Sequence, residues 1–85
     1  MNTTIEIVDR KTVSINFDST IGNETVLLEG DVYDGDIKLY KTDILSNPSL
    51  SRCNFSEIED AISYHNSLPC DRSITIIYDD EYYKE

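Results

Sequence analysis

The stretch that decides the fold is residues 27–41, which read LLEGDVYDGDIKLYK. Asp34-Gly35 separates two runs of alternating apolar and polar side chains, and this dipeptide is typical of the two-residue type I′ turn of a β-hairpin. Because the loop length sets the register, it fixes which residues face each other. The expected pairs are Val32 with Ile37, Gly30 with Leu39 and Leu28 with Lys41 on one face, and Asp31 with Lys38 and Glu29 with Tyr40 on the other. Gly30 indicates a bulge or a place where another group packs closely.

Two more strands are expected upstream of this hairpin. Residues 5–7 and 13–17 alternate between apolar and polar side chains, and the polar turn Asp9-Arg10-Lys11 lies between them. Residues 18–23 indicate a looser segment, with Gly22-Asn23 as its turn signal. The first half of the chain is therefore expected to consist of strands.

One helix and one further strand are expected downstream. Residues 42–52 indicate a connecting loop, in which Ser46-Asn47-Pro48 favours a single helical turn. A helix is predicted over 55–68, with Asn54 as its N-cap and Glu57 at the capping-box position. Its apolar side consists of Phe55, Ile58, Ala61, Ile62, His65 and Leu68, and its polar side of Glu57, Asp60, Ser63, Tyr64 and Ser67. Residues 73–78 are apolar on both faces, which favours a strand in the interior of the sheet.

These elements together predict an α+β protein with the order ββββαβ. One antiparallel sheet of about five strands would carry the helix on one of its faces. With 85 residues, the chain is expected to form a single domain, spanning residues 1–85. Residues 79–85 form an acidic, tyrosine-containing tail, for which a frayed terminus is one interpretation.

Charge is the most unusual property of the composition. Asp and Glu number 17 against 7 Lys and Arg, which gives a formal net charge of -10. Such a chain is expected to repel nucleic acid and anionic membrane surfaces, and to attract basic protein surfaces. The alternative is that the acidic charge only keeps the protein in solution, and the composition does not decide between the two.

The inventory of catalytic side chains is small. His65 is the only histidine, so one chain cannot supply a metal site with two imidazoles, and we interpret it as a half-buried, hydrogen-bonded side chain. Cys53 and Cys70 flank the helix, whose length of about 20 Å prevents a disulfide between them. No nucleotide-binding loop, nucleophile elbow or zinc-protease motif occurs. We therefore expect no enzymatic activity and no cofactor or metal; a nucleophile pair of Cys70 and His65 is the enzymatic alternative.

The expected location is the cytoplasm. The N-terminal residues MNTTIE lack the basic start and the apolar run of a signal peptide. No apolar run in the chain is long enough for a transmembrane helix. Reduced, unpaired cysteines agree with this location.

Carboxylates and tyrosines are the candidates for contact with a partner. Tyrosine is favoured at protein interfaces because it is large, fairly rigid and amphipathic. Acidic side chains next to tyrosines occur on the polar side of the predicted helix and in the C-terminal tail. The candidate residues are Glu57, Asp60, Tyr64, Asp79, Asp80, Glu81, Tyr82 and Tyr83.

The length, the charge and the acidic runs Glu57-Ile58-Glu59-Asp60 and Asp79-Asp80-Glu81 resemble those of small phage-encoded inhibitors of host defence, the class that includes anti-CRISPR proteins and other DNA mimics. The resemblance implies a non-catalytic inhibitor whose carboxylates occupy the phosphate sites of a host nuclease or CRISPR effector. The partner would be a nucleic-acid-handling protein, and the chain would not bind nucleic acid directly. The alternative is a small regulatory or adaptor protein that binds a partner through a sheet edge or an apolar patch. The oligomeric state stays open.

Overall fold

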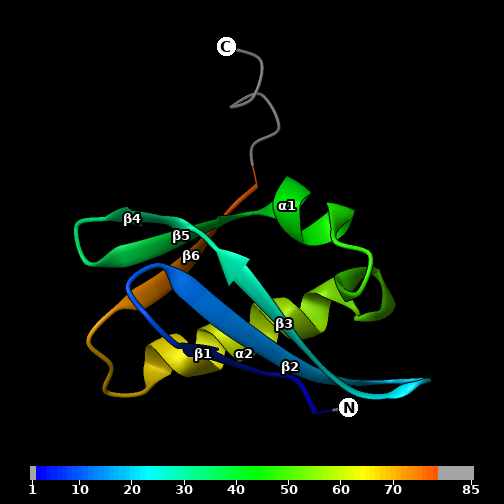
Figure 1. The fold of residues 1–85 in the computed structure, drawn as a ribbon. Coiled ribbons are helices and arrows are strands. Elements are labelled where there is room, and N and C mark those ends of the chain that lie inside the picture. Colours follow the sequence, from blue (N-terminus) through cyan, green and yellow to red (C-terminus); the bar gives the residue numbers. More distant parts are fainter. Residues whose placement is uncertain (1, 79–85) are drawn as a thin grey trace.

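A computed structural model describes residues 2–78 of the chain, and the tail candidates at 79–83 lie outside these residues. The described residues form an α+β structure of mainly strands and one main helix, as predicted (Figure 1). The elements are β1 (Thr4–Ile7), β2 (Thr12–Ser19), β3 (Gly22–Glu29), β4 (Asp31–Tyr33), β5 (Asp36–Tyr40), α1 (Lys41–Ser46), the short 3-10 helix η1 (Leu50–Arg52), α2 (Phe55–Ser67) and β6 (Ser73–Ile77).

The strands form two three-stranded sheets, so the prediction of one antiparallel sheet of five strands is wrong. One sheet has the order β1-β2-β3 and is antiparallel throughout. The other has the order β4-β5-β6, in which β5 and β6 run parallel. The parallel pair arises because the chain leaves β5, passes through the helices and returns to the same sheet, which is a crossover connection.

The Asp34-Gly35 hairpin forms with the predicted turn and register. Val32 pairs with Ile37 and Asp31 with Lys38. Both loop residues have positive φ, 56° for Asp34 and 82° for Gly35, as a type I′ turn requires.

The pairs predicted beyond Asp31 are wrong, because the strand expected over residues 27–33 divides at Gly30. Leu28 pairs with Val13 and Glu29 with Thr12, both in the other sheet. The predicted pairs that do not form are Gly30 with Leu39, Glu29 with Tyr40 and Leu28 with Lys41.

Gly30 is the point at which the chain passes from one sheet to the other. Its N–H donates to the Lys11 carbonyl oxygen at 2.9 Å. A Cβ atom at this position would lie 2.5 Å from the Lys38 carbonyl oxygen and 2.8 Å from Ile37 Cγ2. A side chain does not fit into that space, so the close packing predicted at Gly30 is confirmed.

Two segments expected to be irregular are ordered. Strand β2 continues to Ser19 and β3 begins at Gly22, so Thr20 and Ile21 alone form the turn that was predicted over residues 18–23. The expected loop over 42–52 contains α1, which begins at Lys41 and was not predicted. The helical turn predicted at Ser46-Asn47-Pro48 is confirmed, because Asn47 Oδ1 accepts from the N–H groups of Ser49 and Leu50 and the chain continues into η1. Hairpin pairing and burial of apolar side chains override the weak local signals here.

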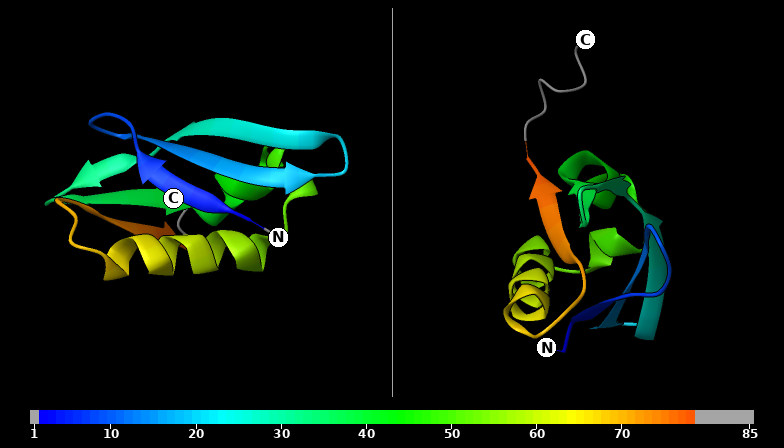
Figure 2. Two further views of the ribbon diagram at one scale, coloured as in Figure 1. Left: turned by 90° about the horizontal axis from the view of Figure 1, so that it is seen from below. Right: turned by 90° about the vertical axis from the view of Figure 1, so that its left-hand side faces the viewer.

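Helix α2 closes the open side of an arch formed by the two sheets (Figure 2). It packs against β1 at one end of the arch and against β6 at the other. Asn54 Oδ1 accepts a hydrogen bond from the Ser56 N–H at 3.0 Å, which confirms the predicted N-cap. The helix ends at Ser67, and Leu68, expected on its apolar side, is 45% exposed.

Strand β6 lies at the edge of its sheet, which corrects the prediction of an interior position. Its inward residues Ile74 and Ile76 are buried, whereas Thr75 between them is exposed. On the side away from β5, the Asn66 side chain accepts from the Ile74 N–H at 2.9 Å and donates to the Ile74 carbonyl at 2.8 Å. One side-chain amide of α2 thus supplies the hydrogen bonds that a neighbouring strand would give.

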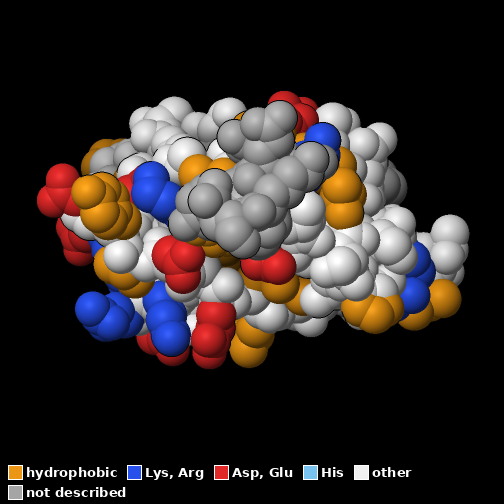
Figure 3. Space-filling view, turned by 90° about the horizontal axis from the view of Figure 1, so that it is seen from above, with side chains coloured by type: hydrophobic (Ala, Val, Ile, Leu, Met, Phe, Trp, Pro, Cys, Tyr) orange, Lys and Arg blue, Asp and Glu red, His pale blue; other side chains and the backbone are white. Residues whose placement is uncertain are grey.

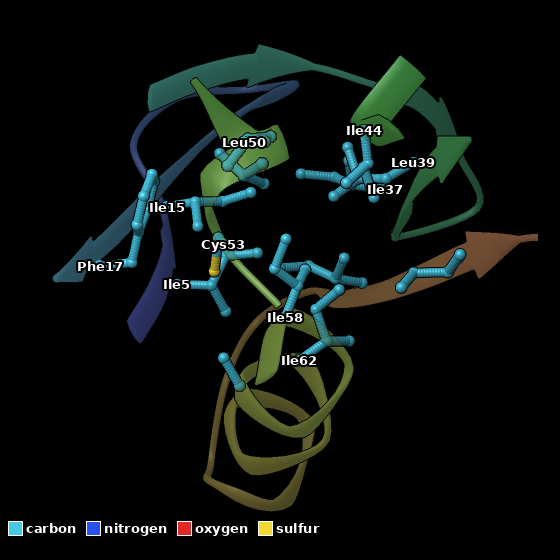
Figure 4. Packing of buried hydrophobic residues seen from close by; sticks show 14 residues of the cluster. Ile5, Ile15, Phe17, Ile37, Leu39, Ile44, Leu50, Cys53, Ile58 and Ile62 are labelled. Atoms are coloured by element: carbon cyan, nitrogen blue, oxygen red, sulfur yellow. The ribbon is translucent and has the colours of Figure 1, made fainter. Parts of the chain in front are cut away.

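The core fills the space between both sheets and the helices (Figure 4). Each sheet contributes the side chains on its concave face, and α1, η1 and α2 each add at least one. The most deeply buried side chains are Val13, Ile15 and Phe17 from β2, Ile37 and Leu39 from β5, Ile44 from α1, Leu50 from η1, Ile58 from α2 and Ile74 from β6. The two sheets therefore depend on each other for the burial of their apolar faces.

Beside this core, Arg52 of η1 is joined to Glu24 of β3. The guanidinium donates from Nε and Nη2 to the two carboxylate oxygens at 2.9 and 2.8 Å. Ser19 Oγ also donates to the Glu24 carboxylate. The hydrogen bonds from Arg52 and then Ser19 lower the pKa of Glu24 from 4.5 to about 2.

We predict that Gly30→Ala destabilises the fold by about 1–3 kcal/mol, because the new Cβ must displace the β5 backbone. The measurement is urea unfolding followed by circular dichroism. Gly35→Asn is the control, because nothing lies within 4 Å of a Cβ there and Asn tolerates positive φ. Equal unfolding midpoints for Gly30→Ala and wild type would contradict the close approach.

We predict that the stabilising effect of Glu24 depends on pH. The folded-state pKa is depressed, so the contribution is present above the ordinary value of 4.5 and is lost as the pH falls towards about 2. Melting temperatures of wild type and Glu24→Gln, measured between pH 7 and pH 2, should differ most at neutral pH and converge in acid. A constant difference over this range would show that the ion pair does not form.

Candidate protein-binding groove

Three of the eight predicted partner-binding residues lie together in a groove between α2 and β1. Glu57, Asp60 and Tyr64 form part of its wall, and its volume is about 270 Å³. The remaining lining residues are Thr3, Thr4 and Ile5 at β1, and Ala61, His65 and Leu68 at α2 and its C-terminal end. The other five predicted residues, Asp79, Asp80, Glu81, Tyr82 and Tyr83, lie outside the described residues.

The groove exists because α2 packs beside β1 and not across the face of the sheet. Ala61 is the small buried residue on the side of α2 that faces β1. Thr3 joins the two elements, since its Oγ1 donates to Glu57 Oε1 at 2.9 Å. Tyr64 is 67% exposed, so its ring is available to a partner.

A second hollow of about 330 Å³ continues along the same strand. It is lined by Glu6, Ile7, His65, Cys70, Asp71 and Arg72. His65 belongs to both hollows, and their β1 residues follow one another in sequence. The groove therefore follows the length of β1 towards the loop before β6.

The carboxylates beside the groove have no basic partner among residues 2–78. Glu57 and Asp60 form no ion pair with the described Lys and Arg side chains, nor does Glu6 of β1. Lys11 pairs with Glu29, Lys38 with Asp36 and Arg52 with Glu24, and Lys41 lies over the rings of Phe55 and Tyr78. Arg72, which lines the second hollow, donates to the carbonyls of Asp9 and Arg10. Glu57 and Asp60 at the first hollow therefore carry negative charges that no ion pair within residues 2–78 offsets.

The face seen from above has a different character. Basic and acidic side chains are interspersed there, with apolar side chains between them (Figure 3). Mixed charges of this kind cancel at distances beyond about 8–10 Å at ordinary ionic strength.

A tyrosine on the other side of α2 engages a third carboxylate. The Tyr78 hydroxyl donates to Glu59 Oε2 at 2.5 Å, and this hydrogen bond raises the pKa of Tyr78. The Phe55 and Tyr78 rings are perpendicular, with centroids 6.3 Å apart. Glu59 therefore helps to hold the end of β6 against α2. Glu57 and Asp60 are the acidic residues of α2 that line the groove.

The side chains that could serve catalysis have structural surroundings. His65 is half-buried and its Nε2 lies 3.1 Å from the Arg72 carbonyl oxygen, which confirms the interpretation of a hydrogen-bonded histidine. Cys53 and Cys70 are both free, as predicted. Cys53 is buried, and this burial raises its pKa.

Two further properties concern the described residues as a whole. Within residues 2–78, no group of three or more His, Cys, Asp or Glu side chains is arranged to hold a metal ion. None of the helices in this part of the chain combines the length and apolar character needed to cross a membrane.

The β1 side of the groove was not predicted from the sequence. Thr3, Thr4 and Glu6 were assigned to a strand, but alternation of side chains does not tell which strand lies beside the helix. A capping box at Glu57 was expected, whereas the Glu57 carboxylate accepts from Thr3 Oγ1 in the structure. This contact between distant segments has no local signal.

We predict that Cys70 reacts with iodoacetamide about tenfold or more faster than Cys53, because Cys70 is exposed and Cys53 is buried with a raised pKa. The measurement is the alkylation rate at each cysteine, followed by mass spectrometry of the folded protein. In denaturant the two rates should become similar. Equal rates at Cys70 and Cys53 in the folded protein would contradict the prediction. A rate at Cys70 far above that of a free cysteine peptide would favour the Cys70–His65 nucleophile.

The groove is interpreted from its own residues, because comparisons with known proteins give no match. No protein-family model matches the chain, and no curated protein or solved structure matches it either.

Proposed function

We propose that the protein is a non-catalytic binding protein that engages a basic protein surface through α2 and the groove between α2 and β1. The observation that carries this proposal is the combination, in one groove, of an exposed tyrosine with carboxylates that have no basic partner among residues 2–78. Tyrosine supplies contact area at a small entropic cost, and the carboxylates select for basic partners.

The proposed class of partner is a protein whose binding surface carries a cluster of Lys and Arg side chains. Nucleases and guide-RNA effectors hold nucleic acid in positively charged channels. Glu57 and Asp60 are three residues apart on a helix, which places their Cβ atoms about 5–6 Å apart on one side. A rigid helix with carboxylates at this spacing can occupy the sites of successive phosphates, so we propose inhibition by acidic mimicry of nucleic acid.

This mechanism places the target and the inhibitor in the same compartment. The chain carries a net charge of -10 and is repelled by nucleic acid itself, so its target is the protein that binds nucleic acid. A host nuclease or CRISPR effector acts in the cytoplasm, which is where we propose that the protein acts. Binding would exclude DNA or RNA by competition and would weaken as salt screens the exposed charges.

We predict that Glu57→Gln/Asp60→Asn weakens partner binding about tenfold and reduces its dependence on salt. Gln at position 57 keeps an acceptor for Thr3, so the groove should stay intact. The experiment is a pull-down from bacterial lysate with tagged protein, with elution by salt and, separately, by competing DNA. Affinities of the captured protein are then measured for each variant.

The matched control is Asp34→Asn/Asp43→Asn, which removes the same charge from exposed positions in the β4–β5 turn and in α1. Wild-type binding by this control, with loss in the groove variant, would assign the interaction to the groove. Equal binding by all three proteins would contradict the proposal. Retention of a salt-resistant partner that DNA does not displace would favour the adaptor alternative.

A further inference from the structure

Strand β1 presents backbone groups to the groove. The Val8 N–H donates to the Thr12 carbonyl oxygen at 2.9 Å, and this bond continues the register between β1 and β2. Because hydrogen-bonded pairs alternate along an antiparallel ladder, the even-numbered residues of β1 bond to β2 and the odd-numbered ones direct their N–H and C=O groups away from it. Ile5 and Ile7 therefore leave carbonyl oxygens beside the two hollows that they line.

An arginine of the chain itself binds carbonyl oxygens just beyond the end of β1. Arg72, which lines the second hollow together with Ile7, donates from Nη2 to the Asp9 carbonyl oxygen at 3.0 Å and from Nη1 to that of Arg10. A guanidinium is suited to this role because its planar fork reaches two acceptors at once. The carbonyl oxygens further along β1 offer the same chemistry to an arginine from outside.

Tyr64 differs from the other exposed tyrosines in its surroundings. Three tyrosines among residues 2–78 are more than half exposed, namely Tyr33, Tyr64 and Tyr78. The Lys38 ammonium group lies 5.5 Å from the centroid of the Tyr33 ring, and that of Lys41 lies 5.9 Å from the centroid of the Tyr78 ring. Within residues 2–78, no Lys or Arg lies over the Tyr64 ring. Its face, which attracts cations, is therefore vacant on the groove.

Asp60 lies one helical turn before Tyr64, so its carboxylate and the Tyr64 ring share one side of α2. It is exposed and forms no ion pair within residues 2–78. Glu57, in contrast, has one carboxylate oxygen bonded to Thr3. The groove thus combines a ring face, a free carboxylate and backbone carbonyl oxygens, all of which attract a cationic donor.

We propose that the groove receives an arginine side chain of the partner, with its guanidinium against the Tyr64 ring and its N–H groups on Asp60 and the β1 carbonyl oxygens. This inference rests on the proposed function and names the side chain that the groove recognises. Arginine fits better than lysine, because its planar group stacks on a ring while it bonds at its edge, whereas an ammonium group is a point charge. The volume of about 270 Å³ is small for a site that encloses a whole ligand, and it suits a single side chain.

The test compares hexa-arginine with hexa-lysine, which carry the same charge, by NMR titration of the isotope-labelled full chain. We expect hexa-arginine to bind about tenfold more tightly, with the largest amide shifts around Tyr64 and in β1. Tyr64→Leu should remove this preference because the stacking surface is lost, whereas Tyr33→Leu, at an equally exposed tyrosine, should keep it. Asp60→Asn should weaken hexa-arginine about fivefold, and the charge-matched control Asp43→Asn less than about twofold.

Equal affinities for the two peptides would overturn the inference, and so would an arginine preference that survives in Tyr64→Leu. All four substitutions are at exposed positions, and circular dichroism checks that the variants fold. A captured partner that needs Glu57 and Asp60 supports the proposed function even where the arginine preference is absent. An arginine preference without a captured basic partner supports the arginine site and counts against the proposed function. The two proposals therefore fail separately.

Discussion

The fold depends on the close approach of Gly30 to the backbone of β5. The gap of 2.5 Å between a Cβ at this position and the Lys38 carbonyl oxygen leaves room only for glycine. Because the chain can bend at this point, β3 pairs with β2 and β4 pairs with β5, so one run of residues belongs to two sheets. The bend gives the arch its curvature, and the arch creates the space that Ile58 and the rest of the α2 apolar side fill.

The sequence predicts the structural features that depend on neighbouring residues, and it misses the contacts between segments that are distant in the chain. The Asp34-Gly35 turn, the Asn54 cap and the apolar side of α2 depend on neighbouring residues and are found as expected. The division at Gly30 depends on Lys11 in the turn between β1 and β2, which is distant in sequence, so the pattern of residues 27–33 indicated one strand. In the groove, α2 residues were predicted from charge and helical spacing. Thr3 and Glu6 were not, because pairing between β1 and α2 has no periodic signal.

Charge is distributed unevenly over the molecule because of the positions of its few basic residues. Lys11 and Arg52 neutralise the two ends of β3, and Lys41 lies 5.4 and 5.9 Å from the centroids of the Phe55 and Tyr78 rings. Individual exposed pairs add little to stability, commonly 0–1 kcal/mol. Their larger effect is on the distribution of charge, since Lys11 and Arg52 offset Glu29 and Glu24 of β3, whereas Glu57 and Asp60 of α2 have no ion pair within residues 2–78. The same net charge therefore gives one neutral edge and one acidic side.

Within residues 2–78, the two sheets have four edge strands, β1, β3, β4 and β6, and these edges differ in what lies beside them. The edge of β6 is satisfied by the Asn66 amide, which bonds to both backbone groups of Ile74. The edge of β1 lies beside α2, with the groove and its carboxylates between them. The free edge of β3 has β5 close to it at Gly30, and at the other end Arg52 of η1 bonds to Glu24. Unpaired carboxylates beside a strand edge favour a cationic partner, and this is the physical basis of the function proposed for the groove.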